Sequence, residues 1–153
     1  MTTGLFLIVL LGVSIVAPFV RKYLKNAAGW VYAIWPFAGF LYYLSLLPEI
    51  NQGNVITETH EWIPVIGLNF SFYVDGFSLL FSLLVLGIGT FIMVYADYYM
   101  KPYPMKGRFM GYLLLFMTAM QGIVVSGNLI TMFVFWELTS ISSYMLIGYY
   151  HEK

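Results

Sequence analysis

The chain has 153 residues, of which 61% are hydrophobic, 20% aromatic and 9% charged, and its formal net charge is zero. A soluble domain is typically about 45–50% apolar and about 25% charged, so this composition, with a mean hydropathy of +0.83, is typical of an integral membrane protein. The balanced charge leaves no basic face for nucleic acid, and the lack of cysteine excludes disulfides and thiolate metal sites. We expect neither a metal nor another cofactor.

Two uncharged runs open the chain, and each is long enough to cross a bilayer, which takes roughly 20 apolar residues. The first run predicts a helix over 3–20, which the basic residues Arg21 and Lys22 follow. A secretory signal peptide carries its positive charges before the apolar run, so we expect this helix to be retained. The second run predicts a helix over 27–48, in which Pro36 should produce a kink or a local break.

Residues 49–75 differ from the runs around them because they contain acids and no lysine or arginine. Within them, "LNFSFYVD" alternates apolar and polar residues over 68–75, a pattern typical of a strand. Pro64 and Gly67 suit a turn back to a partner strand over 56–63. We therefore predict a small β-hairpin on the membrane surface, with an irregular loop as the alternative.

Three further helices are expected after the hairpin. The first covers 75–97, with Asp75 as its N-cap, because an aspartate there can accept a hydrogen bond from a free amide. Residues 109–150 then form an apolar run with one charged residue. As a single helix this run would be about 63 Å long, roughly twice the thickness of the hydrocarbon core. The turn-forming tripeptide "SGN" divides it into helices over 108–126 and 129–150.

The predicted fold is all-α and membrane-integral, with five transmembrane helices and a hairpin between the second and the third, and residues 1–153 form one domain. If the five helices alternate across the bilayer, all seven lysines and arginines lie on one side and none on the other. The positive-inside rule then places the carboxy terminus in the cytoplasm, and the amino terminus and the hairpin outside. We therefore expect a multi-pass protein of the inner (cytoplasmic) cell membrane.

The last predicted helix carries Glu137 close to its middle, where an acidic residue costs roughly 2.5–3.5 kcal/mol on insertion scales. The Leu, Ile, Phe and Val residues of this helix favour insertion by about 3–5 kcal/mol in all, which barely exceeds that cost. We therefore expect the helix to pack inside a bundle, with Glu137 facing protein or internal water. A carboxyl group that is alternately near to and far from a cation can hold and release a proton. The sequence thus predicts that Glu137 translocates protons, with a protonated structural glutamate as the alternative.

Polar residues that share the face of Glu137 are candidates to support a proton path. Ser140 and Tyr144 fall on this face at helical spacing. His151 lies at the cytoplasmic end of the same face, where a titratable imidazole can pass protons. A solvated residue at the end of a helix is the simpler interpretation of His151.

The preceding helix carries two polar residues near mid-membrane, Thr118 and Gln121. They can hold water on a proton path, although hydrogen bonding between helices is the simpler interpretation. Gly107 and Gly111 have the spacing of a helix-packing motif, but they lie at the entrance of the helix. Asp97 and the basic "KPYPMKGR" that follows are interpreted as a connection that sets topology.

Two stretches, "RFMGYLLLFMTAMQGIVVSGNLITMFVFWELTSISSYMLIGYYHEK" and "FSFYVDGFSLLF", resemble the antiporter-like subunits that Mrp-type multisubunit sodium/proton antiporters share with respiratory complex I. The resemblance implies that Glu137 is the membrane-embedded glutamate of this family, which translocates protons together with a lysine on a later helix, outside these 153 residues. It also implies that the chain is either a split or truncated subunit or the amino-terminal segment of a larger one. Other membrane subunits would then be its partners, and Na⁺ and H⁺ its transported ions.

Two alternatives to a cation/proton antiporter subunit remain open at the level of sequence. A proton-pumping subunit of a complex I-like or membrane-bound hydrogenase-like redox complex would carry the same acid, with iron–sulfur and quinone modules in its assembly. A structural membrane scaffold would carry the acid only as a packing element. Under the leading interpretation the chain moves ions and is not an enzyme.

Overall fold

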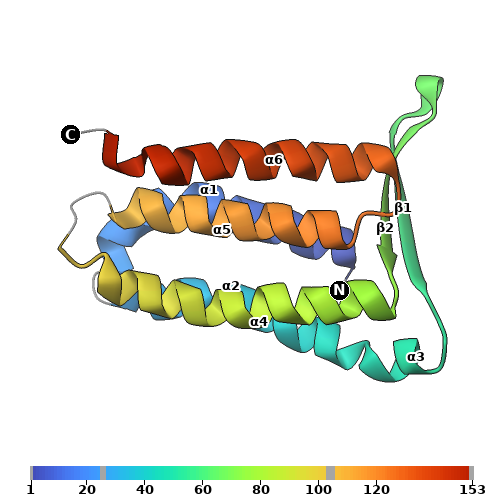
Figure 1. Ribbon diagram of the computed structural model, residues 1–153, viewed down its shortest axis with the longest axis horizontal. Coiled ribbons are helices and arrows are strands. Elements are labelled where there is room, and N and C mark those ends of the chain that lie inside the picture. The colour runs from blue at the N-terminus through green and yellow to red at the C-terminus, as the bar shows by residue number, and fades with distance from the viewer. Residues whose placement is uncertain (1, 25–26, 103–105, 152–153) are drawn as a thin grey trace.

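The computed structural model describes residues 2–24, 27–102 and 106–151. Five long helices run side by side along its long axis (Figure 1), and each is long and apolar enough to cross a membrane. They are α1 (Thr3–Leu24), α2 (Ala28–Ser45), α4 (Gly76–Tyr99), α5 (Lys106–Val124) and α6 (Leu129–Ile147). The predicted five-helix membrane fold is confirmed.

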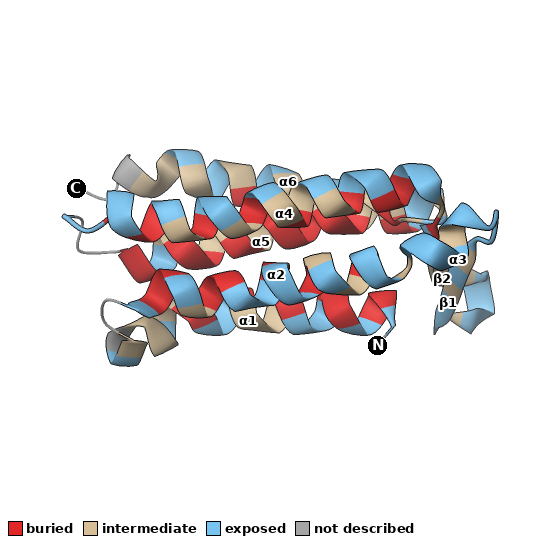
Figure 2. Ribbon diagram, turned by 90° about the horizontal axis from the view of Figure 1, so that it is seen from below, coloured by how far each residue is buried: buried red, intermediate tan, exposed pale blue. Residues whose placement is uncertain are grey.

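The helices form two layers. α4, α5 and α6 lie in a row, while α1 packs against α5 and α2 packs against α4 (Figures 1 and 2). The buried residues follow the facing sides of the two layers (Figure 2), and the core includes Leu10, Tyr43, Leu86, Met93 and Leu114. Because α6 packs mainly against α5, it lies at the edge of the row.

The first two helices differ from the prediction in their extent. α1 continues through Arg21 to Leu24, beyond its predicted end at residue 20. α2 runs through Pro36 without interruption and ends at Ser45, where a short helix α3 (Leu47–Asn51) follows. The predicted alternative of a local break at Pro36 is therefore wrong. A proline removes only one intrahelical hydrogen bond, and membrane helices tolerate this loss where neighbouring groups or local adjustment compensate for it.

The hairpin consists of β1 (Ile56–Ile63) and β2 (Leu68–Val74), which pair antiparallel as predicted. Gly67 follows the turn at a φ of +67°, a left-handed conformation that favours glycine. The hairpin crosses one end of the bundle, here called the hairpin end, where the amino terminus also lies (Figure 1). After β2, Asp75 caps α4 as predicted, because its Oδ1 accepts a hydrogen bond from the Ser78 amide at 2.8 Å.

The turn between α5 and α6 is attached to β2. The Gly127 amide donates to the Ser71 carbonyl at 2.7 Å, and the Ser71 amide donates to the Thr131 hydroxyl at 3.0 Å. Asn128 caps α6 by accepting from the Thr131 amide at 2.7 Å, and its own side-chain amide donates to the Asn69 carbonyl at 2.8 Å. The predicted "SGN" turn is thus present, and the hairpin fixes where α6 begins.

The glycine pair at the start of α5 lets α1 approach closely. A Cβ at Gly111 would lie 2.8 Å from the Ser14 carbonyl oxygen and 3.2 Å from Pro18, and one at Gly107 would lie 2.9 Å from the Cβ of Arg21. Close approach through small residues is a common way for membrane helices to associate. The motif therefore serves packing within this chain.

Replacing Gly111 with Ala is expected to destabilise the fold by about 1–3 kcal/mol, the usual cost of overpacking, because the obstructing atom belongs to the backbone. Gly12→Ala in α1 is the matched control, since nothing lies within 4 Å of a Cβ there. Helix propensity favours alanine over glycine by up to about 1 kcal/mol, so the control should be neutral or stabilising. Unfolding in detergent micelles measures both, and equal effects of the two variants would contradict the close approach.

Candidate functional site

Glu137 lies near the middle of α6, and its side chain is exposed. The ion pairs within 4 Å among the described residues involve Asp97 and Glu58, and none involves Glu137. The expectation that this helix packs inside a bundle is not met within the described chain, because α6 lies at the edge of its row. Hydropathy and polar content indicate that a helix needs protein around it, but they do not indicate which segment provides that protein.

Two residues predicted to share the face of Glu137, Ser140 and Tyr144, are exposed as well. Ser140 is exposed, and its hydroxyl donates to the Trp136 carbonyl at 3.3 Å. Tyr144 is 79% exposed. His151 ends the 3-10 turn η3 (Gly148–His151), and its side chain lies outside the part of the chain that the structure describes.

The opposite face of α6 holds the helix on its neighbour. Thr131, Phe135 and Ser142 are buried there. The ring of Phe135 lies so close to Gly122 of α5 that a Cβ at Gly122 would collide with it. This contact fixes the rotation of α6, and it turns Glu137 away from α5.

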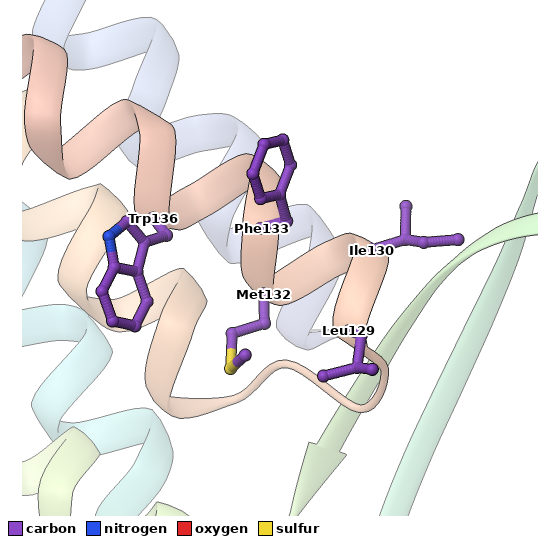
Figure 3. Close-up of a pocket in the computed structure, with 5 residues that line it drawn as sticks. All are labelled: Leu129, Ile130, Met132, Phe133 and Trp136. Atoms are coloured by element: carbon purple, nitrogen blue, oxygen red, sulfur yellow. The ribbon is translucent and has the colours of Figure 1, made fainter.

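An apolar hollow of about 370 Å³ lies on the half of α6 nearest the hairpin end, as Figure 3 shows. Its lining consists of Leu129, Ile130, Met132, Phe133 and Trp136. The last of these residues is adjacent to Glu137 in the sequence. The surface beside the acid is therefore suited to apolar side chains of further protein or to lipid.

Thr118 and Gln121 are fully buried in α5, whereas Glu137 is exposed, so the structure does not bring these residues together. The Gln121 side-chain amide donates to the Ser82 hydroxyl of α4 at 2.8 Å, which is the interhelical bond expected as the simpler alternative. The Thr118 hydroxyl instead donates to the Leu114 carbonyl of its own helix at 2.8 Å.

A buried ionic cluster lies at the end of the bundle opposite the hairpin. Lys106 Nζ of α5 is 2.6 Å from Asp97 Oδ1 of α4, and Arg21 Nη2 of α1 is 3.9 Å from the same oxygen. The side chains of Asp97 and Lys106 are only 1% and 5% exposed. A Cβ at Gly29 of α2 would collide with Asp97, so the glycine makes room for the acid. The cluster joins three helices directly.

Sequence reasoning missed this cluster by treating Asp97 and Lys106 only as topological signals. One signal was available. Asp97 comes near the end of one helix and Lys106 begins the next, and a short connection makes successive helices antiparallel neighbours. Opposite charges at these two positions must then meet at the same end of the bundle.

Glu58 is a second acid whose position the sequence did not reveal. It extends from the hairpin to the first turn of α1, where its two carboxylate oxygens accept from the amides of Thr3 at 2.7 Å and Gly4 at 3.0 Å. His60 Nε2 lies 3.9 Å from one of these oxygens. An acid at a helix N-terminus pairs with free amides and with the helix dipole, so Glu58 fastens the hairpin to α1.

The fold defines a multi-pass membrane protein, and Glu137 lies near the middle of one of its five long apolar helices. The family described as NADH-ubiquinone oxidoreductase (complex I), chain 5 N-terminus, matches residues 62–110. The chain is 43% identical over 141 residues to the A1 subunit of the Na(+)/H(+) antiporter of Staphylococcus haemolyticus, and 42% identical over 142 residues to the A subunit of the Na(+)/H(+) antiporter of Alkalihalophilus pseudofirmus. Each alignment covers 92% of this chain and 18% of the relative.

Two solved structures contain the same arrangement of helices. One is the Mrp complex from a Dietzia species, with a TM-score of 0.84 and 28% identity over 96% of this chain and 16% of that one. The other is the membrane-bound sulfane sulfur reductase, an archaeal respiratory membrane complex, with a TM-score of 0.78 and 22% identity over 96% of this chain and 30% of that one. The second likeness concerns the fold alone. The resemblance to the antiporter-like subunits of Mrp-type antiporters is therefore confirmed, and the chain spans less than a fifth of the length of these curated relatives.

Proposed function

We propose that the chain forms part of a subunit of a monovalent cation/proton antiporter, and that Glu137 is the group that takes up and releases the transported proton. The observation that carries the proposal is a lone acid near the middle of a helix that is long and apolar enough to cross a membrane, within a sequence 43% identical to one chain of a Na⁺/H⁺ antiporter. Acids at this depth are costly and mark ion pathways.

The exposed face of Glu137 requires protein cover in the membrane. An ionised carboxylate does not remain against lipid, because hydrocarbon offers it neither hydrogen bonds nor counter-charge. The curated relatives extend far beyond the 18% that this chain matches. Further helices of a longer polypeptide are therefore proposed to pack on this face, with their apolar side chains in the hollow at Phe133 and Trp136.

The covering helices would also carry a lysine near Glu137. With the ammonium group close, the carboxylate is stabilised and the proton leaves; with the ammonium group distant, the carboxyl group takes a proton up again. Movement of that cation thereby couples proton transfer to a second event, the binding of Na⁺ elsewhere in the complex. Ser140 and Tyr144 share the face of Glu137 and would hold water or a proton along the path, and His151 would extend that path.

The end of the bundle that carries the basic residues is proposed to face the cytoplasm, and the hairpin end the outside, in accordance with the positive-inside rule. Arg21, Lys101, Lys106 and Arg108 all lie at or near the end opposite the hairpin. The partners of the chain are then the other membrane subunits of a hetero-oligomeric antiporter in the cell membrane.

A redox-driven proton pump is the second candidate function. The match of residues 62–110 to a family whose description names NADH-ubiquinone oxidoreductase (complex I) favours it. The two candidates share the role of Glu137 and differ in what drives the proton.

Vesicles containing the intact complex separate these functions. An imposed Na⁺ gradient, with no electron donor present, is expected to drive proton movement that a pH-sensitive dye records. Proton movement that requires an electron donor and ignores Na⁺ would show the redox alternative. No proton movement under either condition would leave the chain with a structural role.

A further inference from the structure

A second polar site lies inside the bundle near the hairpin end, separate from the face of Glu137. Four side chains from four helices meet there, and each of them is buried: Thr3 of α1, Tyr43 of α2, Ser82 of α4 and Gln121 of α5. The relative exposure of each is 0%. The Tyr43 hydroxyl lies beside both Gln121 and Thr3.

The hydrogen bonds within this cluster leave three of its buried polar atoms without a partner in the described chain. Gln121 uses its amide nitrogen to bond Ser82. Among the described residues, the Thr3 hydroxyl, the Tyr43 hydroxyl and the Gln121 carbonyl oxygen have no hydrogen-bond partner. A buried polar group left unpaired costs about 1–3 kcal/mol, so three such groups at one place favour a shared partner.

We propose that this cluster binds one ordered water molecule between α1, α2 and α5. A buried water typically makes about three hydrogen bonds to polar groups that are otherwise unsatisfied. The water accepts a hydrogen bond from the Tyr43 hydroxyl and donates to the Gln121 carbonyl oxygen and to the Thr3 hydroxyl. This arrangement gives each orphaned group a partner, and it joins three helices through one molecule.

The charge of the cluster favours water over a cation. Its members are hydroxyl and amide groups without a formal charge, and a cation buried without counter-charge is costly. Glu58 lies beside Thr3, but its two oxygens already accept hydrogen bonds from the Thr3 and Gly4 amides. The alternative is a direct chain in which the Thr3 hydroxyl donates to Tyr43 and the Tyr43 hydroxyl donates to Gln121; such a chain holds no water and would leave Tyr43 no more easily oxidised than a buried tyrosine without water beside it.

X-ray radiolysis of the intact complex in its membrane tests the proposal. Radiation splits bound water and oxidises the side chains beside it, including buried ones. Tyr43 should therefore be oxidised several-fold faster than Tyr32, which is a matched control. Tyr32 is also buried in α2, but its hydroxyl donates to the Ala17 carbonyl at 2.7 Å.

Two variants sharpen the comparison. Gln121→Leu removes an acceptor and should reduce the oxidation of Tyr43 to the rate of Tyr32, whereas Thr118→Val on the same helix should leave it unchanged. An unaltered rate for Tyr32 confirms that each variant remains folded. Equal rates for Tyr43 and Tyr32 in the unmodified complex would overturn the proposal. Oxidation of Tyr43 that falls when Na⁺ replaces choline would also overturn it, because a cation would then occupy the site.

Discussion

Replacing Glu137 with Gln is expected to reduce Na⁺-dependent proton flux to the background of vesicles that lack the complex. Glutamine has the size and hydrogen-bonding capacity of a protonated glutamate, but it can neither release nor take up a proton. The exposed position of Glu137 on α6 means that few contacts within this chain change with the substitution. Assembly into the membrane should therefore be unaffected, and the loss should be specific to transport.

Two further variants serve as controls for this prediction. Glu137→Asp keeps a titratable carboxyl group and should retain part of the flux. Glu61→Gln makes the same chemical change at an exposed position of the hairpin and should leave the flux unchanged. Normal transport by Glu137→Gln, measured with a pH-sensitive dye in vesicles containing equal amounts of complex, would exclude Glu137 from the proton path.

Replacing Asp97 with Asn is expected to cost about 3–5 kcal/mol of stability, the usual effect of removing one partner from a buried ion pair. The substitution leaves Lys106 and Arg21 without their shared carboxylate. Lys106→Met should cost less, because Arg21 remains 3.9 Å from Asp97 and still compensates its charge. The two substitutions should differ in cost because one carboxylate faces two cations.

The double variant Asp97→Asn/Lys106→Met provides the control for this prediction. It removes both members of the close pair, so it should be more stable than the sum of the two single effects implies. Unfolding of the detergent-solubilised protein gives the free energies for the cycle. Additive effects would show that the ion pair contributes no coupling. Equal costs for the two single substitutions would show that Arg21 does not compensate the charge of Asp97 when Lys106 is removed.

Much of the fold could be predicted from local signals in the sequence. Apolar runs with at most one charged residue locate the five helices, the alternation over 68–75 locates a strand, and Asp75 marks the start of α4. The apolar runs predict helices because a membrane requires every backbone polar group of a spanning segment to be paired within a helix or a closed sheet. Few structures satisfy that requirement, so composition alone excludes most others.

The place of α6 could not be predicted in the same way. Lipid and a neighbouring helix are equally apolar, so hydropathy does not distinguish a helix inside a bundle from one at its edge. Glu137 indicates that the face needs protein cover, but the described chain does not provide it. The continuation of α2 through Pro36 could not be predicted either, since a proline can bend a helix or break it.

The two candidate sites also differ in how far the sequence predicts them. The shared face of Glu137, Ser140 and Tyr144 follows from helical periodicity and could be predicted. The cluster of Thr3, Tyr43 and Gln121 could not, because its members lie far apart in the sequence and only the packing of α1, α2 and α5 brings them together.

The most direct test of the account follows the carboxyl band of Glu137 by infrared difference spectroscopy while the intact complex transports ions, with Glu137→Gln used to assign the band. The band of the protonated acid is expected to appear and disappear during turnover. A carboxyl group that stays in one state throughout transport would contradict the proposed proton exchange.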